Sequence, residues 1–290
     1  MRVKPGKEDA YLSIEKEWRE IHNELARQGK FNSWALWKVA DPKDAGYDFI
    51  TVKYFDSLSD CNNEYDWEEI EGFFGKDKLG SLFRRTQEAR TKISSTVWQL
   101  ADYTMSLVPS KAKPAFPQAM IGYLKVTPGK EENCEKMEKT VFSKFWQKVA
   151  AKDPRFIGWR FAKKVSPFKE GLGQDYMTIH LLDSKLTAPS QKQTDELHKQ
   201  VWKEAGLPDF KSLNVKGLRT MVNVVTINKV LETQLESNPV QSYWGKMLGN
   251  WKASLPDGGY RIKRISPGHE DLEIYDKNGK LEGKSSCVKV

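Results

Sequence analysis

Two short stretches of the chain are almost the same: Val3-Lys-Pro-Gly-Lys-Glu8 and Val126-Thr-Pro-Gly-Lys-Glu131. In each, a Pro-Gly pair of the kind that forms turns separates a β-branched residue from a charged segment. The residues that lead into the second stretch, 120–126, are rich in β-forming side chains. A strand, a turn and a helix are therefore expected at both places.

The similarity continues along the chain in the same order. The offset between matched residues grows from 123 to 129, which small insertions in loops explain. Collinear matches of this kind predict a tandem duplication, with copies at residues 1–110 and 118–236 and a Pro-rich linker at 108–117. The matched pairs include Glu15 and Glu138, Phe31 and Phe156, Trp34 and Trp159, Asp48 and Asp175, Thr51 and Thr178, Asp56 and Asp183, and Arg90 and Arg219.

Each copy predicts the same succession of elements. An apolar residue recurs every three or four positions from Tyr11 to Leu25, which is the spacing of one stripe on an amphipathic helix. Runs of β-forming residues predict the strands, and polar periodic segments predict the second helices. The ranges are 31–39 and 156–165 for the second strands, 47–55 and 176–182 for the third strands, 62–85 and 193–205 for the second helices, and 91–100 and 219–230 for the last strands.

The order strand, helix, strand, strand, helix, strand is that of the ferredoxin-like fold, an antiparallel sheet with helices on one face. Two such sheets in one chain can cover each other's open faces. On this order and the two Pro-Gly-Lys-Glu openings, residues 1–236 resemble the dimeric α+β barrel superfamily, which includes antibiotic-biosynthesis-type monooxygenases, stress-responsive barrel proteins, haem-degrading monooxygenases and the chlorite dismutase group. The resemblance implies an α+β fold in which two tandem ferredoxin-like units form a pseudo-dimeric barrel within one chain.

Residues 242–290 differ in composition, with Gly, Asp and alternating β-forming residues, and predict a small β-meander. Asn278-Gly279 lies between two alternating runs, which is a strong hairpin signal. Gly249-Asn250-Trp251 resembles the Gly-x-Trp start of lipocalin-like barrels, although the segment is shorter than an eight-stranded barrel requires. We expect either a meander that packs on the barrel or a truncated lipocalin-like segment. The second copy also suggests strand residues upstream of Met1.

Alternation along the third strands assigns their side chains to the two faces of each sheet. We expect Met177, Ile179 and Leu181 to pack under the helices. Thr178 and His180 would then point into the space between the two sheets. The other residues expected around this space are Thr51, Lys53, Asn223, Trp34 and Trp159.

These residues suggest particular chemistry. His180 is the natural general base or metal or haem ligand, because its unperturbed pKa lies near neutrality; a hydrogen-bonded structural histidine is the alternative. Asn223 is the second catalytic candidate. His22, next to the helical stripe, is expected at the surface or at its boundary. The candidate ligand-binding residues are Trp34, Trp159, Lys53, Thr51 and Thr178, the tryptophans either by stacking or by packing alone.

Two functions fit these residues and the expected fold. The first is a non-catalytic binding or stress-associated barrel that holds a small apolar molecule. The second, which the resemblance implies, is a cofactor-independent or haem-dependent monooxygenase that acts on a small apolar or aromatic substrate in the lumen. Because no catalytic constellation is complete, the residues leave open the enzymatic activity, the cofactor and the oligomeric state.

Composition and motifs argue against several other classes. The three cysteines are far apart, so neither a disulfide framework nor a metal knuckle is indicated. The net charge is +8, yet neither copy contains the aromatic RNP1 pattern, and no nucleic-acid partner is expected. The sequence holds no membrane-length apolar run and no export signal, which predicts a cytoplasmic protein. A signal upstream of Met1 would make it periplasmic or secreted.

Overall fold

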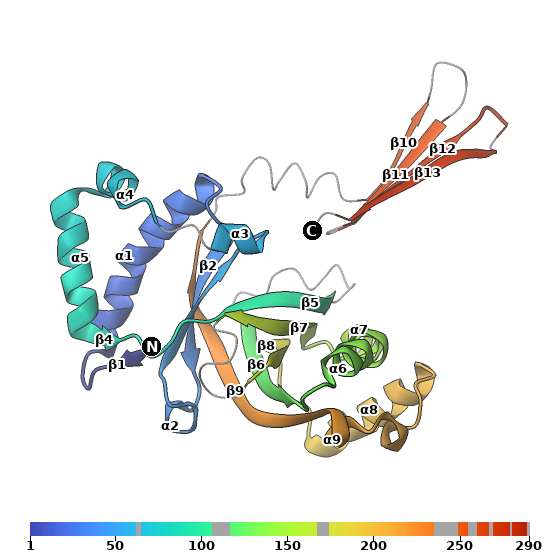
Figure 1. Cartoon of the computed structure of the whole chain (residues 1–290), viewed down its shortest axis with the longest axis horizontal. Coiled ribbons are helices and arrows are strands. Elements are labelled where there is room, and N and C mark those ends of the chain that lie inside the picture. Colours follow the sequence, from blue (N-terminus) through green and yellow to red (C-terminus); the bar gives the residue numbers. More distant parts are fainter. Residues whose placement is uncertain are drawn as a thin grey trace. The chain divides into compact units, whose positions relative to one another are not determined.

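The computed structural model describes residues 1–61, 65–105, 117–166, 174–234, 249–254, 260–266, 269–278 and 280–288 (Figure 1). Most of the expected linker and the start of the expected meander lie outside these residues. The first half of the chain contains β1 (Arg2–Val3), α1 (Glu8–Arg27), β2 (Ser33–Val39), α2 (Pro42–Ala45), β3 (Phe49–Tyr54), α3 (Leu58–Cys61), α4 (Trp67–Phe74), α5 (Lys76–Ala89), β4 (Arg90–Thr91) and β5 (Val97–Met105).

The second half follows with a similar order of elements. Its first helical region is continuous through a π-helical turn, and short helices precede its last strand. The elements are β6 (Pro117–Val126), α6 (Glu131–Met137), η1 (Glu138–Phe142), α7 (Ser143–Lys152), β7 (Phe156–Ser166), β8 (Tyr176–Asp183), α8 (Gln191–Glu204), η2 (Phe210–Leu213), α9 (Val215–Leu218) and β9 (Arg219–Glu232). The strands and helices expected from the sequence are confirmed to within a few residues, with two exceptions in the first half. Helices α4 and α5 divide the expected second helix, and residues 92–96, inside the expected last strand 91–100, form neither helix nor strand.

A curled seven-stranded sheet is the centre of this mixed α+β fold (Figure 1). Its strand order is β3-β2-β9-β6-β8-β7-β5, and the pairs from β2 to β5 are antiparallel. The four strands of the second half are therefore neighbours, flanked by strands of the first half. Helices α6 to α9 lie beside the strands of the second half, while α1, α4 and α5 lie beside those of the first.

Strands β1 and β4 form a separate antiparallel pair, which lies next to β3 at one end of the seven-stranded sheet. The amino group of Met1 donates to the Phe49 carbonyl oxygen at 2.8 Å, and the Phe49 amide donates back to the Met1 carbonyl oxygen at 3.2 Å. These bonds set β1 beside β3. The strands of the first half thus follow the order β4-β1-β3-β2, and those of the second half follow β9-β6-β8-β7.

The loops and ends of the two halves make the same contacts. The Val3 amide donates to the Asp48 carboxylate at 2.7 Å, and the Val126 amide donates to the Asp175 carboxylate at 3.0 Å. Gly6 and Gly129, in the two Pro-Gly turns, have φ values of 71° and 77°, in the left-handed region that glycine adopts without strain. The shared motif therefore encodes the same turn twice.

Each half also buries one ion pair between its first helix and its last strand. Glu15 pairs with Arg90 at 3.7 Å, and Glu138 pairs with Arg219 at 2.8 Å. Both glutamates are at most 2% exposed. Removing one partner of such a pair would leave an uncompensated buried charge, so each pair opposes separation of its helix from its strand.

The first helices show how the sequence sets the packing. In α1 the predicted stripe is confirmed, because Tyr11, Ile14, Trp18, Ile21 and Leu25 are all buried. In the second half the offset of equivalent buried residues rises from 123 at Glu138 to 124 at Val149, across the π-helical turn η1. A π-helical turn holds one more residue than an α-helical turn, so this single step of the offset lies inside the helix and not in a loop, where the sequence-based explanation expected it.

Strands β10 (Gly249–Ser254), β11 (Tyr260–Ser266), β12 (His269–Tyr275) and β13 (Leu281–Val288) form a four-stranded antiparallel meander. They belong to a second compact unit of the chain. The Asp276 carboxylate accepts hydrogen bonds from the amides of Asn278 and Lys280, which closes the turn between β12 and β13. The predicted hairpin at this position is confirmed.

Candidate functional site

The sheet has two apolar faces, and both are covered in part. One face packs under helices α6 to α9, and we call its residues the helix-side cluster. The other face is the concave side, and we call its residues the inner-face cluster. The helix-side cluster includes Leu124, Met137, Phe145, Phe156, Trp159, Phe161, Tyr176 and Val201. The inner-face cluster comprises Ala35, Trp37, Val39, Ala119, Ile121, Val225 and Ile227, with Tyr47, Ile50, Val52, Tyr123, Met177, Ile179 and Leu181 packed against it.

The inner face is filled unevenly. On the central strands β6 and β9, Ile121, Val225 and Ile227 are buried. On β3 and β8, by contrast, the inner-face side chains such as Val52 and Ile179 remain half-buried. Because ligand sites are lined mainly by apolar side chains with a few polar groups, these half-buried residues are the candidate lining for an apolar ligand.

Two tyrosines supply polar groups to this face. The hydroxyl oxygens of Tyr47 and Tyr123 lie 3.5 Å apart, and the Trp98 ring lies 6.2 Å from the ring of Tyr123. Burial raises the pKa of both phenols, so they are neutral near pH 7. When one hydroxyl donates to the other, a second O–H hydrogen stays available for an acceptor on a ligand.

Trp37 adds a further donor. Its side chain is buried on the inner face, and its indole Nε1 has no hydrogen-bond partner among the described residues. The ammonium of Lys229 lies 5.5 Å from the Trp37 ring centroid and forms an ion pair with Glu232 at 2.8 Å. Buried donors without partners are rare in proteins, so the indole N–H also favours a ligand that carries a hydrogen-bond acceptor.

His180 lies on the face opposite to the one expected. Its ring centroid is 4.2 Å from that of Trp146 on α7 and 5.9 Å from that of Phe156. Burial, and then the neighbouring His198 and Arg219, lower the pKa of His180 to about 4. The expected orientation of Thr178 and His180 toward the inner space is therefore wrong, and Met177, Ile179 and Leu181 face it instead.

Thr51 and Lys53 are also on the helix side, because Ile50 and Val52 alternate with them and face inward. The Lys53 ammonium lies 3.7 Å from the Tyr65 ring centroid, and burial lowers the pKa of Lys53 to about 8. The Tyr65 hydroxyl is hydrogen-bonded to Nε2 of His22 at 2.9 Å.

His22 is therefore not a surface residue, which corrects the expectation from the sequence. It is 6% exposed and stacks on Trp34 with ring centroids 4.7 Å apart. Burial lowers the pKa of His22 well below its ordinary value. A histidine beside an apolar stripe lies at the boundary or in the core according to what covers it, and here Tyr65 and Trp34 lie against its ring.

The remaining predicted site residues divide between the two faces. Trp34 and Trp159 are fully buried, and Trp159 belongs to the helix-side cluster. Asn223 pairs across the strands with Tyr123, so its side chain shares the inner face, as expected. His180 and Asn223 consequently do not converge on one space. Sequence reasoning missed Tyr47, Trp37 and Tyr123. Only Trp37 had a signal in the sequence, its odd separation from Trp34, which was assigned inward.

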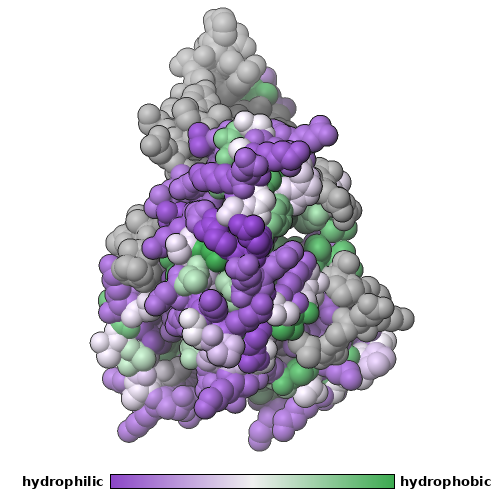
Figure 2. All heavy atoms as spheres, turned by 90° about the vertical axis from the view of Figure 1, so that its left-hand side faces the viewer, coloured by the Kyte–Doolittle hydropathy of each residue, from purple (hydrophilic) through white to green (hydrophobic). Residues whose placement is uncertain are grey.

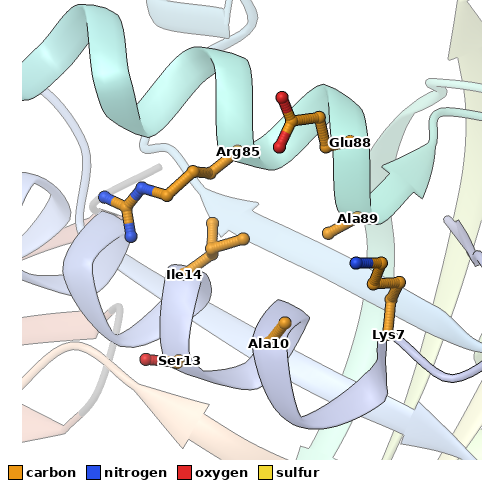
Figure 3. A pocket seen from close by; sticks show the side chains of 7 residues that line it. All are labelled: Lys7, Ala10, Ser13, Ile14, Arg85, Glu88 and Ala89. Atoms are coloured by element: carbon orange, nitrogen blue, oxygen red, sulfur yellow. The ribbon is translucent and has the colours of Figure 1, made fainter.

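A separate shallow pocket lies between α1 and α5 (Figure 3). Its volume is about 230 Å³, with Ala10, Ile14 and Ala89 between the charged side chains of Lys7, Arg85 and Glu88. Arg85 is engaged by both carboxylate oxygens of Glu17 at 2.7 Å. The surrounding surface is largely hydrophilic (Figure 2). This shallow groove has no converging polar groups and does not compete with the inner face as a candidate site.

The residues do not suit a bound metal or haem on the inner face. Among the described residues, no three His, Cys, Asp or Glu side chains gather closely enough to hold a metal ion. A haem on that face would lie across the sheet from His180, whose ring is against Trp146. No helix in the described part of the chain has the length and apolar character to cross a membrane.

Comparisons with known proteins leave the function open. No protein-family model matches the chain, and no curated protein matches it in sequence. One solved structure, described as "Crystal structure study of anthrone oxidase-like protein", is similar over 82% of this chain and 91% of its own, with 14% identity and a TM-score of 0.42.

Proposed function

We propose that the chain is a tandem duplication of a ferredoxin-like unit, whose halves form one α+β barrel that binds a small, largely apolar molecule in its lumen. The repeated strand order, the two Val–Asp contacts at the Pro-Gly turns and the two buried Glu–Arg pairs support the duplication. The pairings of β2 with β9 and of β5 with β7 join the halves on both sides.

One observation carries the binding function: the half-buried apolar side chains on the inner face of β3 and β8, above all Ile50, Val52, Met177, Ile179 and Leu181. A sheet interior that served only as a core would bury these residues as fully as Ile121 or Ile227. The phenols of Tyr47 and Tyr123 and the indole of Trp37 supply the few neutral donors that orient a ligand.

The monooxygenase alternative has less support. Its residues were His180, Asn223 and Trp159, and these belong to two different faces of the sheet. A binding role needs only the apolar lining and the neutral donors. Asn223 remains a candidate for contact with the ligand.

Titration with the apolar fluorescent probe 1-anilinonaphthalene-8-sulfonate tests the proposal. In Ile179→Phe the larger side chain occupies inner-face space, and we expect the probe affinity to fall at least tenfold. Val224→Phe is the matched control, since Val224 lies on the opposite face of the same sheet and is 49% exposed. Equal affinities for both variants and the natural protein would refute binding on the inner face.

A further inference from the structure

Trp37 and Lys229 bring hydrogen-bond donors together on the inner face. They lie directly opposite each other on β2 and β9, so their side chains share that face. Trp37 is 5% exposed, and its indole Nε1 has no hydrogen-bond partner among the described residues. The Lys229 ammonium lies 5.5 Å from the Trp37 ring centroid, and the Lys229 side chain is 13% exposed. Two donor groups with little access to solvent are therefore neighbours.

Glu232 uses only a part of this donor capacity. Its carboxylate accepts from the Lys229 ammonium at 2.8 Å, and in the part of the chain that the structure describes no other acceptor contacts this ammonium. An ammonium has three N–H donors, so two remain beside the indole N–H. Polar groups with little access to solvent are costly to leave without hydrogen bonds. The complementary ligand group is therefore one that only accepts hydrogen bonds.

The corresponding place in the second half has no such donors. In the proposed duplication, the offsets of 125 in the second strands and 129 in the last strands relate Trp37 to Ala162 and Lys229 to Leu100. Ala162 and Leu100 also lie directly opposite each other, on β7 and β5. The fold thus accommodates an alanine and a leucine at this place and requires neither an indole N–H nor an ammonium. This difference between the halves favours a ligand as the reason for the donors.

Apolar surface continues from the donors. Strand β2 lies between β9 and β3, and the half-buried side chains of Ile50 and Val52 on β3 pack against the cluster that contains Trp37. A bound molecule would therefore meet donors on one side and apolar side chains on the other. Arg160, directly opposite Ile179, adds positive charge to the same face, which attracts anions to it.

We propose that the lumen ligand is an apolar carboxylic acid whose carboxylate accepts hydrogen bonds from the Trp37 indole and the Lys229 ammonium. This inference rests on the proposed lumen site and names the class of its ligand. A carboxylate only accepts, and its two oxygens have about four lone-pair positions, enough for these donors. Its single charge matches one ammonium, whereas a phosphate monoester carries nearly two. The Glu232 side chain is 36% exposed, so water weakens its repulsion of the ligand.

Binding of decanoate and of decan-1-ol to the full chain tests the proposal. The two compounds share the same apolar chain, and only decanoate has the carboxylate. Isothermal titration calorimetry at pH 7 measures both affinities, with decanoate kept below the concentration at which it forms micelles. We expect decanoate to bind at least about tenfold more tightly than decan-1-ol. Decanoate should also move the NMR resonance of the Trp37 indole N–H downfield.

Two variants that each lose one positive charge locate the carboxylate. Lys229→Met should fold, because the exposure of Glu232 leaves its carboxylate hydrated. Lys38→Met is the matched control, since Lys38 follows Trp37 on β2, faces the opposite side of the sheet and pairs with Glu8 of α1. We expect Lys229→Met to weaken decanoate binding at least about tenfold and to leave decan-1-ol binding nearly unchanged. Lys38→Met should change neither affinity.

Three results would overturn the inference. These are equal affinities for decanoate and decan-1-ol, an unchanged decanoate affinity in Lys229→Met, or a loss of decanoate affinity in Arg160→Met alone. Failure of the lumen site itself gives a different result, because then neither compound binds or Ile179→Phe leaves the binding of both unchanged. The two failures are therefore distinguishable.

Discussion

The placement of His180 under the helices predicts how stability depends on pH. Burial against Trp146, with His198 and Arg219 nearby, lowers the pKa of His180 from 6.5 to about 4. Between these two pH values the unfolded chain binds a proton that the folded chain does not. Folding stability is therefore fully present above pH 6.5 and is lost progressively as the pH falls toward 4.

The magnitude follows from the shift. Each pKa unit corresponds to about 1.4 kcal/mol. At pH 5 only about 1.5 units of the shift have taken effect, so the free energy of unfolding would fall by about 2 kcal/mol between pH 8 and pH 5. His180 retains some solvent access, and we therefore expect about 1–2 kcal/mol. In His180→Phe, which keeps an aromatic ring beside Trp146, this part of the pH dependence disappears.

Urea unfolding at several pH values measures the effect. The difference in unfolding free energy between His180→Phe and the natural protein should change in favour of the variant as the pH falls. Thr178→Val, on the same face of β8, is the control and should leave the change of unfolding free energy with pH as it is in the natural protein. If the unfolding free energies of His180→Phe and the natural protein change equally with pH, or if His180 titrates near pH 6.5 by NMR, the helix-side placement is refuted.

Three further predictions concern buried groups and packing. Burial raises the pKa of Glu138 to about 7, although Arg219 opposes the shift, so the stability that this group contributes is present below pH 4.5 and is lost as the pH rises through 7. In urea unfolding, the free energy of unfolding of Glu138→Gln should therefore rise by about 2 kcal/mol relative to that of the natural protein between pH 5 and pH 8. A difference between the two proteins that stays constant with pH would contradict this. Gly122→Ala would place its Cβ 2.9 Å from Met221 Sδ and from Thr178 Oγ1, and we expect a loss of about 1–3 kcal/mol by thermal unfolding. In Gly72→Ala the new Cβ in α4 meets nothing within 4 Å, so this substitution should stabilise the protein by about 0.5–1 kcal/mol. Equal changes in stability for Gly122→Ala and Gly72→Ala would contradict this prediction.

Much of the fold could be predicted from the sequence, because the deciding signals are local. The Pro-Gly turns require glycine at a left-handed position, and the apolar stripe of α1 has helical period. Glutamates and arginines matched in the same order predicted the duplication that we propose. The structure adds that these same residues form the buried pairs of each half.

The faces of β3 and β8 could not be predicted, for a physical reason. Alternation separates two sets of side chains but does not say which set faces inward. Polarity alone assigns the more apolar set, Met177, Ile179 and Leu181, to the helices. Here the helices cover aromatic and polar side chains, including Tyr176 and His180, while the purely aliphatic set lines the inner face. When both faces of a sheet are buried, polarity does not identify the inner one.

Binding of a small apolar molecule on the inner face of the curled sheet can be observed residue by residue. Methyl-labelled NMR spectra recorded during titration with 1-anilinonaphthalene-8-sulfonate give this observation. We expect saturable shift changes at the methyl groups of Ile50, Val52 and Ile179, and none at Val224 on the opposite face. Changes confined to Val224, or no saturable changes at Ile50, Val52 and Ile179, would contradict binding on the inner face.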